Sequence, residues 1–229
     1  MSLGRHDRLI GELAGNLRPV QRLSSPMLRA AGWLAVVFVL ALGLACFANL
    51  EAVWHRVTTA PDLWLAVIGS MLTAIFAAIA AFELSLPDAP RGWAALPLPA
   101  ALLWVGASGF GCLRVWIVPH THVADLGEAR DCLVFIVALS VPLSLLMLTM
   151  LRRACPLYPG LTAAVAGLAA AAAAATLLNF FHPFDAAATD LTVHAAAVVL
   201  VVGANRVLGG RFFGPAARID VTAARAGPK

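Results

Sequence analysis

Residues 63–84 read LWLAVIGSMLTAIFAAIAAFEL, an almost wholly apolar run whose one charged residue, Glu83, lies at its end. A helix needs roughly 20 mostly apolar residues to cross a bilayer. The whole chain is 61% hydrophobic and 12% charged, whereas a soluble domain is about 25% charged. Because such a chain cannot bury its apolar surface within itself, it needs lipid as its solvent. We therefore predict an all-α polytopic membrane protein.

Further runs of this kind predict a bundle of six transmembrane helices. The expected spans are Leu28–Leu50, Leu63–Leu84, Trp93–Leu113, Cys132–Leu151, Leu161–Phe181 and Leu191–Leu208. The fifth contains an alanine run, Ala169–Ala175, and is expected inside the bundle because small residues let helices approach closely. Pro97, Pro99 and Pro142 lie within spans, where neighbouring helices can cover the backbone groups that they free. The bundle would occupy residues 26–210, between an N-terminal segment (1–25) and a C-terminal tail (211–229).

The distribution of basic residues predicts the orientation of the bundle. With the N-terminus inside, all of the 16 Lys and Arg residues except Arg56, Arg114 and Arg130 face the cytoplasm. Cytoplasmic loops of membrane proteins carry such an excess of Lys and Arg. We therefore expect a multi-pass protein of a bacterial inner membrane with both termini in the cytoplasm. Because about 25 polar or mixed residues precede the first apolar run, we expect no cleaved signal peptide.

The N-terminal segment predicts a short amphipathic helix, begun by Asp7 as its cap and ended at Arg18-Pro19. Its apolar positions form one stripe, made of Leu9, Ile10, Leu13 and Leu17. Alone in water so short a helix is marginal, so something should hold it. One interpretation is a helix lying on the inner leaflet. The other is a docking helix for the groove of a cytoplasmic protein.

A family resemblance favours the docking helix. The resemblance rests mainly on residues near the N-terminus, namely Leu9-Ile10, Leu13, Leu17-Arg18-Pro19-Val20, Arg22-Leu23, Pro26 and Trp33-Leu34. Further matches along the chain are Gly111-Cys112-Leu113, Asp131-Cys132, Arg152-Arg153 and Pro156. The chain resembles the NrsF-type membrane proteins, six-span negative regulators of extracytoplasmic-function sigma factors in proteobacteria. The resemblance implies that Leu9, Ile10, Leu13, Leu17, Arg18 and Pro19 bind the sigma factor, and that outward cysteines take part in sensing. Where the family has a second outward cysteine, residues 181–185 contain none, which excludes that family disulfide here.

Two cysteines and several histidines gather on the expected outward face. Cys112 and Cys132 flank the third loop, whereas Cys46 lies in a span and Cys155 faces the cytoplasm. In a periplasm Cys112 and Cys132 could form a disulfide, or they could be two separate small hydrophobic residues. The other candidate sensor residues are His120, His122, His182, Asp185, Asp190 and His194. Thiolate with imidazole suits copper or zinc, and Asp190 and His194 share one helix face, although no spacing here matches an established metal motif.

Two function classes remain after the exclusions. The span centres carry no Asp, Glu, Lys or Arg, no phosphate-binding glycine loop is present, and no catalytic triad can be identified. We therefore expect no enzyme, no catalytic residue and no direct contact with nucleic acid. The first hypothesis is an inner-membrane anti-sigma factor of a stress response, which releases an extracytoplasmic-function sigma factor on a periplasmic metal or redox signal. The alternative is a small-solute or metal-ion transporter whose N-terminal helix only anchors to lipid.

Overall fold

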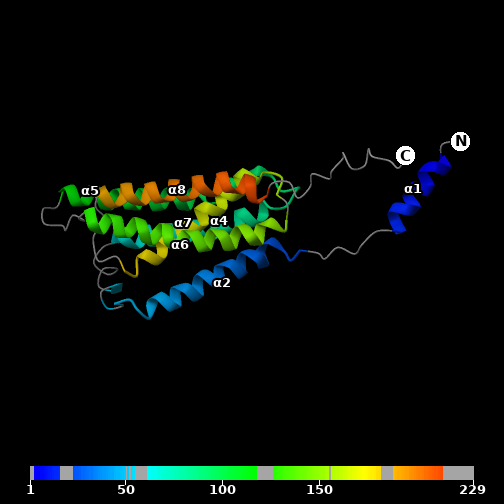
Figure 1. The fold of residues 1–229 in the computed structure, drawn as a ribbon. Coiled ribbons are helices and arrows are strands. Elements are labelled where there is room, and N and C mark those ends of the chain that lie inside the picture. The colour runs from blue at the N-terminus through cyan, green and yellow to red at the C-terminus, as the bar shows by residue number, and fades with distance from the viewer. Residues whose placement is uncertain are drawn as a thin grey trace.

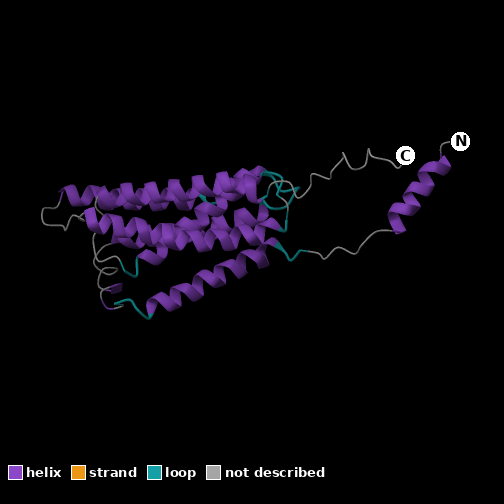
Figure 2. Cartoon of the chain, viewed as in Figure 1, coloured by secondary structure: helices purple, strands orange, loops and turns teal. Residues whose placement is uncertain are grey.

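The computed structural model describes residues 3–15, 23–49, 51, 53–54, 61–117, 126–154, 156–181 and 188–213. Within these residues the regular structure is helical and includes no strand (Figure 2). Six of the described segments are long and apolar enough to cross a membrane. The prediction of an all-α bundle with six membrane-spanning segments is therefore confirmed.

The spans follow the expected order along the chain. The helices are α1 Leu3–Gly15, α2 Pro26–Ala45, α4 Pro61–Glu83, the short 3-10 helix η1 Arg91–Ala95, α5 Leu98–Ile117, α6 Leu126–Arg152, α7 Pro159–Leu178 and α8 Ala188–Phe212 (Figure 1). Because consecutive spans alternate in direction, α2 begins and α8 ends at the same end of the bundle. We call this the arginine-rich end, after Arg29, Arg91, Arg152, Arg153, Arg206 and Arg211. The opposite, distal end holds the end of α7 and the start of α8.

Two spans differ in detail from their predicted form. The first was predicted to run to Leu50, but α2 ends at Ala45, and the chain turns there through hydrogen bonds from Phe47 to Leu44 and from Ala48 to Ala45. Cys46 therefore follows the helix instead of lying within the span, and its side chain is exposed. Its thiol donates to the carbonyl of Leu42 at 3.4 Å.

The third span was predicted as one continuous helix and is interrupted. The 3-10 helix η1 ends at Ala95, and α5 begins at Leu98. Proline lacks an N–H and clashes with the preceding turn, but the first turn of a helix tolerates it. Pro97 and Pro99 therefore lie at the start of α5, where the N–H of Ala101 donates to the carbonyl of Pro97. Pro142, in contrast, remains inside α6.

Helix α7 lies at the centre of the bundle, as its alanine run predicted. It contacts α4, α6 and α8, and every residue of Ala169–Ala175 is buried. The approach to α8 is close at two glycines. A Cβ added to Gly167 would lie 2.9 Å from the Cβ of Asn205, and one added to Gly209 would lie 2.2 Å from the Cβ of Ala163. Small side chains thus let α7 and α8 pack almost backbone to backbone.

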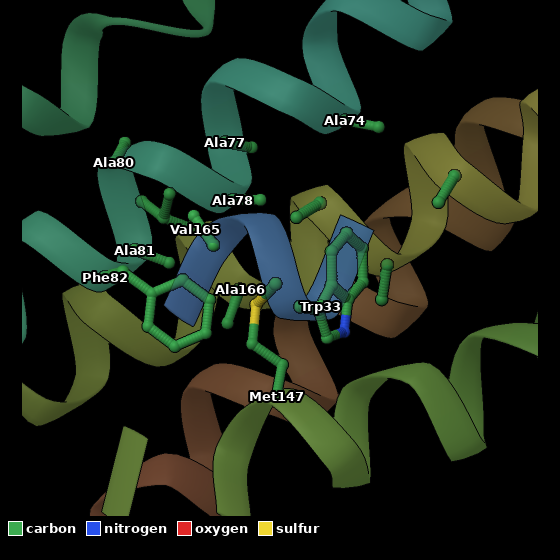
Figure 3. Close-up of a cluster of buried hydrophobic side chains, with 14 of the residues drawn as sticks. Trp33, Ala74, Ala77, Ala78, Ala80, Ala81, Phe82, Met147, Val165 and Ala166 are labelled. Carbon is green, nitrogen blue, oxygen red and sulfur yellow. The ribbon is translucent and has the colours of Figure 1, made fainter. Parts of the chain in front are cut away.

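The largest side chain of the core belongs to the first span. Trp33 of α2 is fully buried (0% exposed). It lies among the alanines of α4, Met147 of α6 and Ala166 of α7 (Figure 3). The indole N–H donates to the carbonyl of Leu143 at 3.2 Å, which is one of the backbone groups on the turn of α6 that contains Pro142. This side chain therefore fixes the first half of α2 to the rest of the bundle.

Candidate functional site

The N-terminal helix α1 presents an exposed apolar stripe. Leu9, Ile10 and Leu13 are 53%, 61% and 61% exposed, and every α1 residue whose side chain is described is exposed. The predicted stripe is thus present on a helix that buries none of it against the described part of the bundle. Figure 1 draws α1 apart from the six spans. This is the arrangement of a helix that offers its apolar face to another surface.

The start of α1 differs from that predicted. The helix begins at Leu3, so Asp7 lies within it and is not its cap. The described helix extends to Gly15. The remaining predicted binding residues, Leu17, Arg18 and Pro19, lie outside the described residues.

A buried arginine holds the start of α2 to two other helices. Arg29 lies in the first two turns of α2 and is only 7% exposed. Its guanidinium donates to the carbonyl of Met150 on α6 and, at 3.3 Å, to the hydroxyl of Ser85 just after α4. The same group lies 4.9 Å from the centroid of the Phe82 ring. A charge this deep is tolerated because hydrogen bonds and the ring face replace its hydration.

Arg29 and Trp33 together form the α2 anchor, and the rest of α2 is loosely held. The buried residues of α2 are Arg29, Ala30 and Trp33, all in its first half. Towards the distal end an apolar groove of about 500 Å³ separates α2 from α4 and α7, and Figure 1 shows α2 diverging from the other spans there. Helix α2 is therefore fixed at the end from which the chain leads to α1.

Sequence reasoning missed the α2 anchor. It counted Arg29 only as one of the cytoplasmic charges. The available signal was its position, three residues after Pro26 and inside an apolar run, where an arginine needs a partner. The sequence gives no indication that this partner is the far end of α6.

The two predicted sensor cysteines lie within helices rather than at loop edges. Cys112 is in the last part of α5, and Cys132 is in the second turn of α6. At about 1.5 Å per residue, each lies roughly 8–9 Å inside its helix end. The helices extend further than the apolar runs because polar residues such as Glu128 and Arg130 also favour helix. Cys132 is a free, buried thiol (8% exposed), packed against Ile136, Ala174, Leu178 and Ala197.

The other predicted sensor residues fall into two groups. His120, His122, His182 and Asp185 lie outside the described residues. Asp190 and His194 both lie in α8, four residues apart as predicted, and His194 is partly buried. Within the described ranges, no three His, Cys, Asp or Glu side chains gather as a metal would require. The metal site and the disulfide therefore stay predictions.

Cys132 nevertheless lies where a chemical modification of its thiol would affect the packing of neighbouring helices. Its neighbours belong to α7 and α8 as well as to its own helix. Ala174 and Ala197 are both fully buried (0% exposed). A group added to the thiol of Cys132 would therefore need space that these side chains now occupy. Because close-packed cores respond to added volume by shifting helices, a modification of Cys132 would change the packing of three spans.

Comparison with known proteins gives one match. The family model described as "Negative regulator of sigma F", NrsF, matches residues 13–214. The match extends from the end of α1 through all six spans. The comparison with curated proteins and the comparison with solved structures gave no match.

Proposed function

The chain belongs to this family, the negative regulators of sigma F, and on that basis we propose that it is an inner-membrane anti-sigma factor for an extracytoplasmic-function sigma factor. The observation that carries the proposal is the exposed apolar stripe of α1, with Leu9, Ile10 and Leu13 all more than half exposed. The stripe fits the groove-binding mode, in which an amphipathic helix lays its apolar face into a partner. A sigma factor held this way at the membrane would be kept from RNA polymerase.

The membrane position follows from the six spans. All six are long and apolar enough to cross a bilayer. The arginine-rich end is also the end from which the chain leads to α1. If that end faces the cytoplasm, as the excess of basic residues favours, the docking helix lies in the compartment that contains sigma factors. Both termini then lie in the cytoplasm, and the distal end faces the periplasm.

We propose that the signal is a metal ion or an oxidant and that it acts at the distal end. The candidate thiols are Cys112 and Cys132, and the candidate imidazoles include His182 and His194. Copper or zinc would bind such groups, and a disulfide would join the two thiols. Either event would alter the packing of α6 against α7 and α8 around Cys132. A bundle with two packing arrangements would transmit that change to α2 through Trp33, which contacts α6 at Leu143.

A transporter is the weaker alternative. Such a protein normally places ionisable groups in the middle of its spans, and the sequence has none there. The transporter hypothesis also leaves the exposed stripe of α1 with lipid as its sole partner.

Co-purification tests the proposal. The intact chain, extracted in mild detergent from cells that also express a tagged sigma factor from the same genome, should retain that sigma factor. A variant lacking residues 1–22 but keeping all six spans should insert normally and lose it. Equal recovery of the sigma factor with both forms would refute the role of α1. Failure of the intact chain to retain any extracytoplasmic-function sigma factor of that genome would refute the proposed function.

A further inference from the structure

A second cavity lies between spans and has a polar end. It measures about 460 Å³ and is bounded by α4, α5, α7 and α8. Its polar lining side chains are Ser108 of α5, Asn179 at the end of α7 and His194 of α8. None of the described lining residues is Asp, Glu, Lys or Arg. An apolar pocket with a few convergent polar groups is the common form of a small-molecule site.

The cavity exists because α5 packs closely on α4, whereas α8 packs closely on α7. Helix α5 packs closely on α4, where a Cβ added to Gly69 would lie 2.7 Å from the backbone N of Trp104. Helix α8 packs closely on α7 at Gly167 and Gly209, both towards the arginine-rich end. Helix α5 packs far less extensively on α8 than on α4, and α8 packs mainly on α7, so the cavity lies between these two helix pairs.

The polar and apolar parts of the cavity are ordered along the membrane normal. Asn179 follows the last residue of α7 and His194 lies in the second turn of α8, so both are near the distal end. Val198 lies one turn deeper than His194, and Leu168 lies at the middle of α7. A molecule with a polar head at the distal surface and an apolar chain directed inwards has the same order. A lipid of the distal leaflet is oriented in this way.

The cavity also opens towards the bilayer. Two of its lining residues, Val105 and Val199, are 59% and 71% exposed on the outer surface of the bundle. In a membrane these side chains face lipid, so a ligand can enter sideways from the bilayer without crossing water.

We propose that this cavity binds a single-chain amphiphile that partitions into the membrane and carries a neutral hydrogen-bonding head group, such as a hydroxyl. The head group lies against Ser108, Asn179 and His194, and the chain lies along Leu168 and Val198. No Asp, Glu, Lys or Arg is among the described lining residues, so a phosphate head group, which needs a charged partner, does not fit here. This site is additional to the proposed sigma-factor function and does not depend on it.

Photolabelling of the intact protein in phosphatidylcholine vesicles tests the proposal. The probe is a decanol that carries a diazirine on its chain, and labelled peptides are identified by mass spectrometry. Label is expected on α5 and α8 at residues that line the cavity. Unlabelled 1-decanol should compete at about tenfold lower membrane concentration than decane, because the hydroxyl gains hydrogen bonds that an alkane cannot make. Label distributed over all lipid-facing helices, or equal competition by the two compounds, would overturn the proposal.

Matched variants locate the site. Ala195→Trp fills the cavity and should abolish the competed labelling, whereas Ala204→Trp, on the exposed surface of the same helix and outside the cavity lining, should leave it unchanged. Ser108→Ala and His194→Leu should reduce the advantage of decanol over decane while labelling by the chain persists. These two variants keep the test decisive if Ala195→Trp does not fold. Unchanged decanol preference in both would overturn the assignment of the head-group site.

Discussion

The guanidinium of Arg29 donates a hydrogen bond to the backbone carbonyl of Met150, 121 residues further along the chain. This contact joins the start of the first span to the end of the fourth. The contact bears on the proposed function because it lies at the start of α2, the end of that helix from which the chain leads to α1. Together with the hydrogen bond from Trp33 to the carbonyl of Leu143, it joins the first half of α2 to α6. Under the proposed function, a change in the packing of α6 would reach the segment that leads to α1 through these two side chains.

The first prediction concerns this contact. Arg29→Ala should lower the stability of the bundle by about 1.5–3 kcal/mol. The substitution removes two hydrogen bonds from a charged donor, and the carbonyl of Met150 and the hydroxyl of Ser85 lose that donor. Arg29→Lys should recover only part of the loss. The ammonium keeps the positive charge, but it cannot reproduce the planar arrangement of guanidinium donors. Unfolding in detergent micelles by titration with sodium dodecyl sulfate measures the change. Arg152→Ala, which removes an exposed arginine at the same end, is the control and should cost under about 0.5 kcal/mol.

The second prediction concerns the docking surface. Leu13→Asp places a charge in the middle of the exposed stripe, and burying it unpaired against a partner should weaken sigma-factor binding on the order of a thousandfold. The variant should insert normally and give constitutive transcription of the target genes. Arg8→Ala should have a smaller effect, because charges at the rim mainly change association rate. Binding and transcription that stay normal in Leu13→Asp would show that the main binding surface lies elsewhere.

The third prediction concerns the contact between α7 and α8. Gly209→Ala would place a methyl group 2.2 Å from the Cβ of Ala163 and 3.1 Å from the carbonyl oxygen of Pro159, so the helices must separate. Overpacking of this kind typically costs about 1–3 kcal/mol. Gly203→Ala on the same helix meets nothing within 4 Å and should be neutral or stabilising by up to about 1 kcal/mol. The same detergent titration compares them, and equal stability of the two variants would contradict the close contact.

Hydropathy and residue size were sufficient to predict the number of spans and the central place of α7. Ala169–Ala175 could be assigned to the interior because such small side chains suit close helix contacts. Helix ends were less predictable, because a helix continues through polar residues beyond the lipid, as α6 does at its start. The partner of Arg29 could not be predicted, since a sequence pattern does not distinguish lipid phosphate from a carbonyl on a distant helix. The cavity beside His194 depends on how α4, α5, α7 and α8 pack around it, which no local pattern encodes.

The fourth prediction concerns orientation. A reporter that works only in the cytoplasm should be active when fused after Lys229. A reporter that works only in the periplasm should be active when inserted between Thr121 and Glu128. The expectation rests on the excess of Lys and Arg at one end of the bundle. A C-terminus found outside would contradict the topology and would also remove α1 from the compartment of the sigma factor.

The last prediction distinguishes the two proposed signals. A disulfide needs both thiols, so Cys112→Ser and Cys132→Ser should abolish oxidant-induced transcription equally. A metal site of Cys132 with His182 or His194 should instead lose its copper or zinc response in His182→Ala or His194→Ala and keep it in Cys112→Ser. We expect the metal pattern, because oxidation does not account for the histidines at this end. Cys46→Ser, which removes the exposed thiol at the end of α2, is the control and should respond normally. Normal induction by copper, zinc and a thiol oxidant in all four sensor variants would show that the signal enters elsewhere.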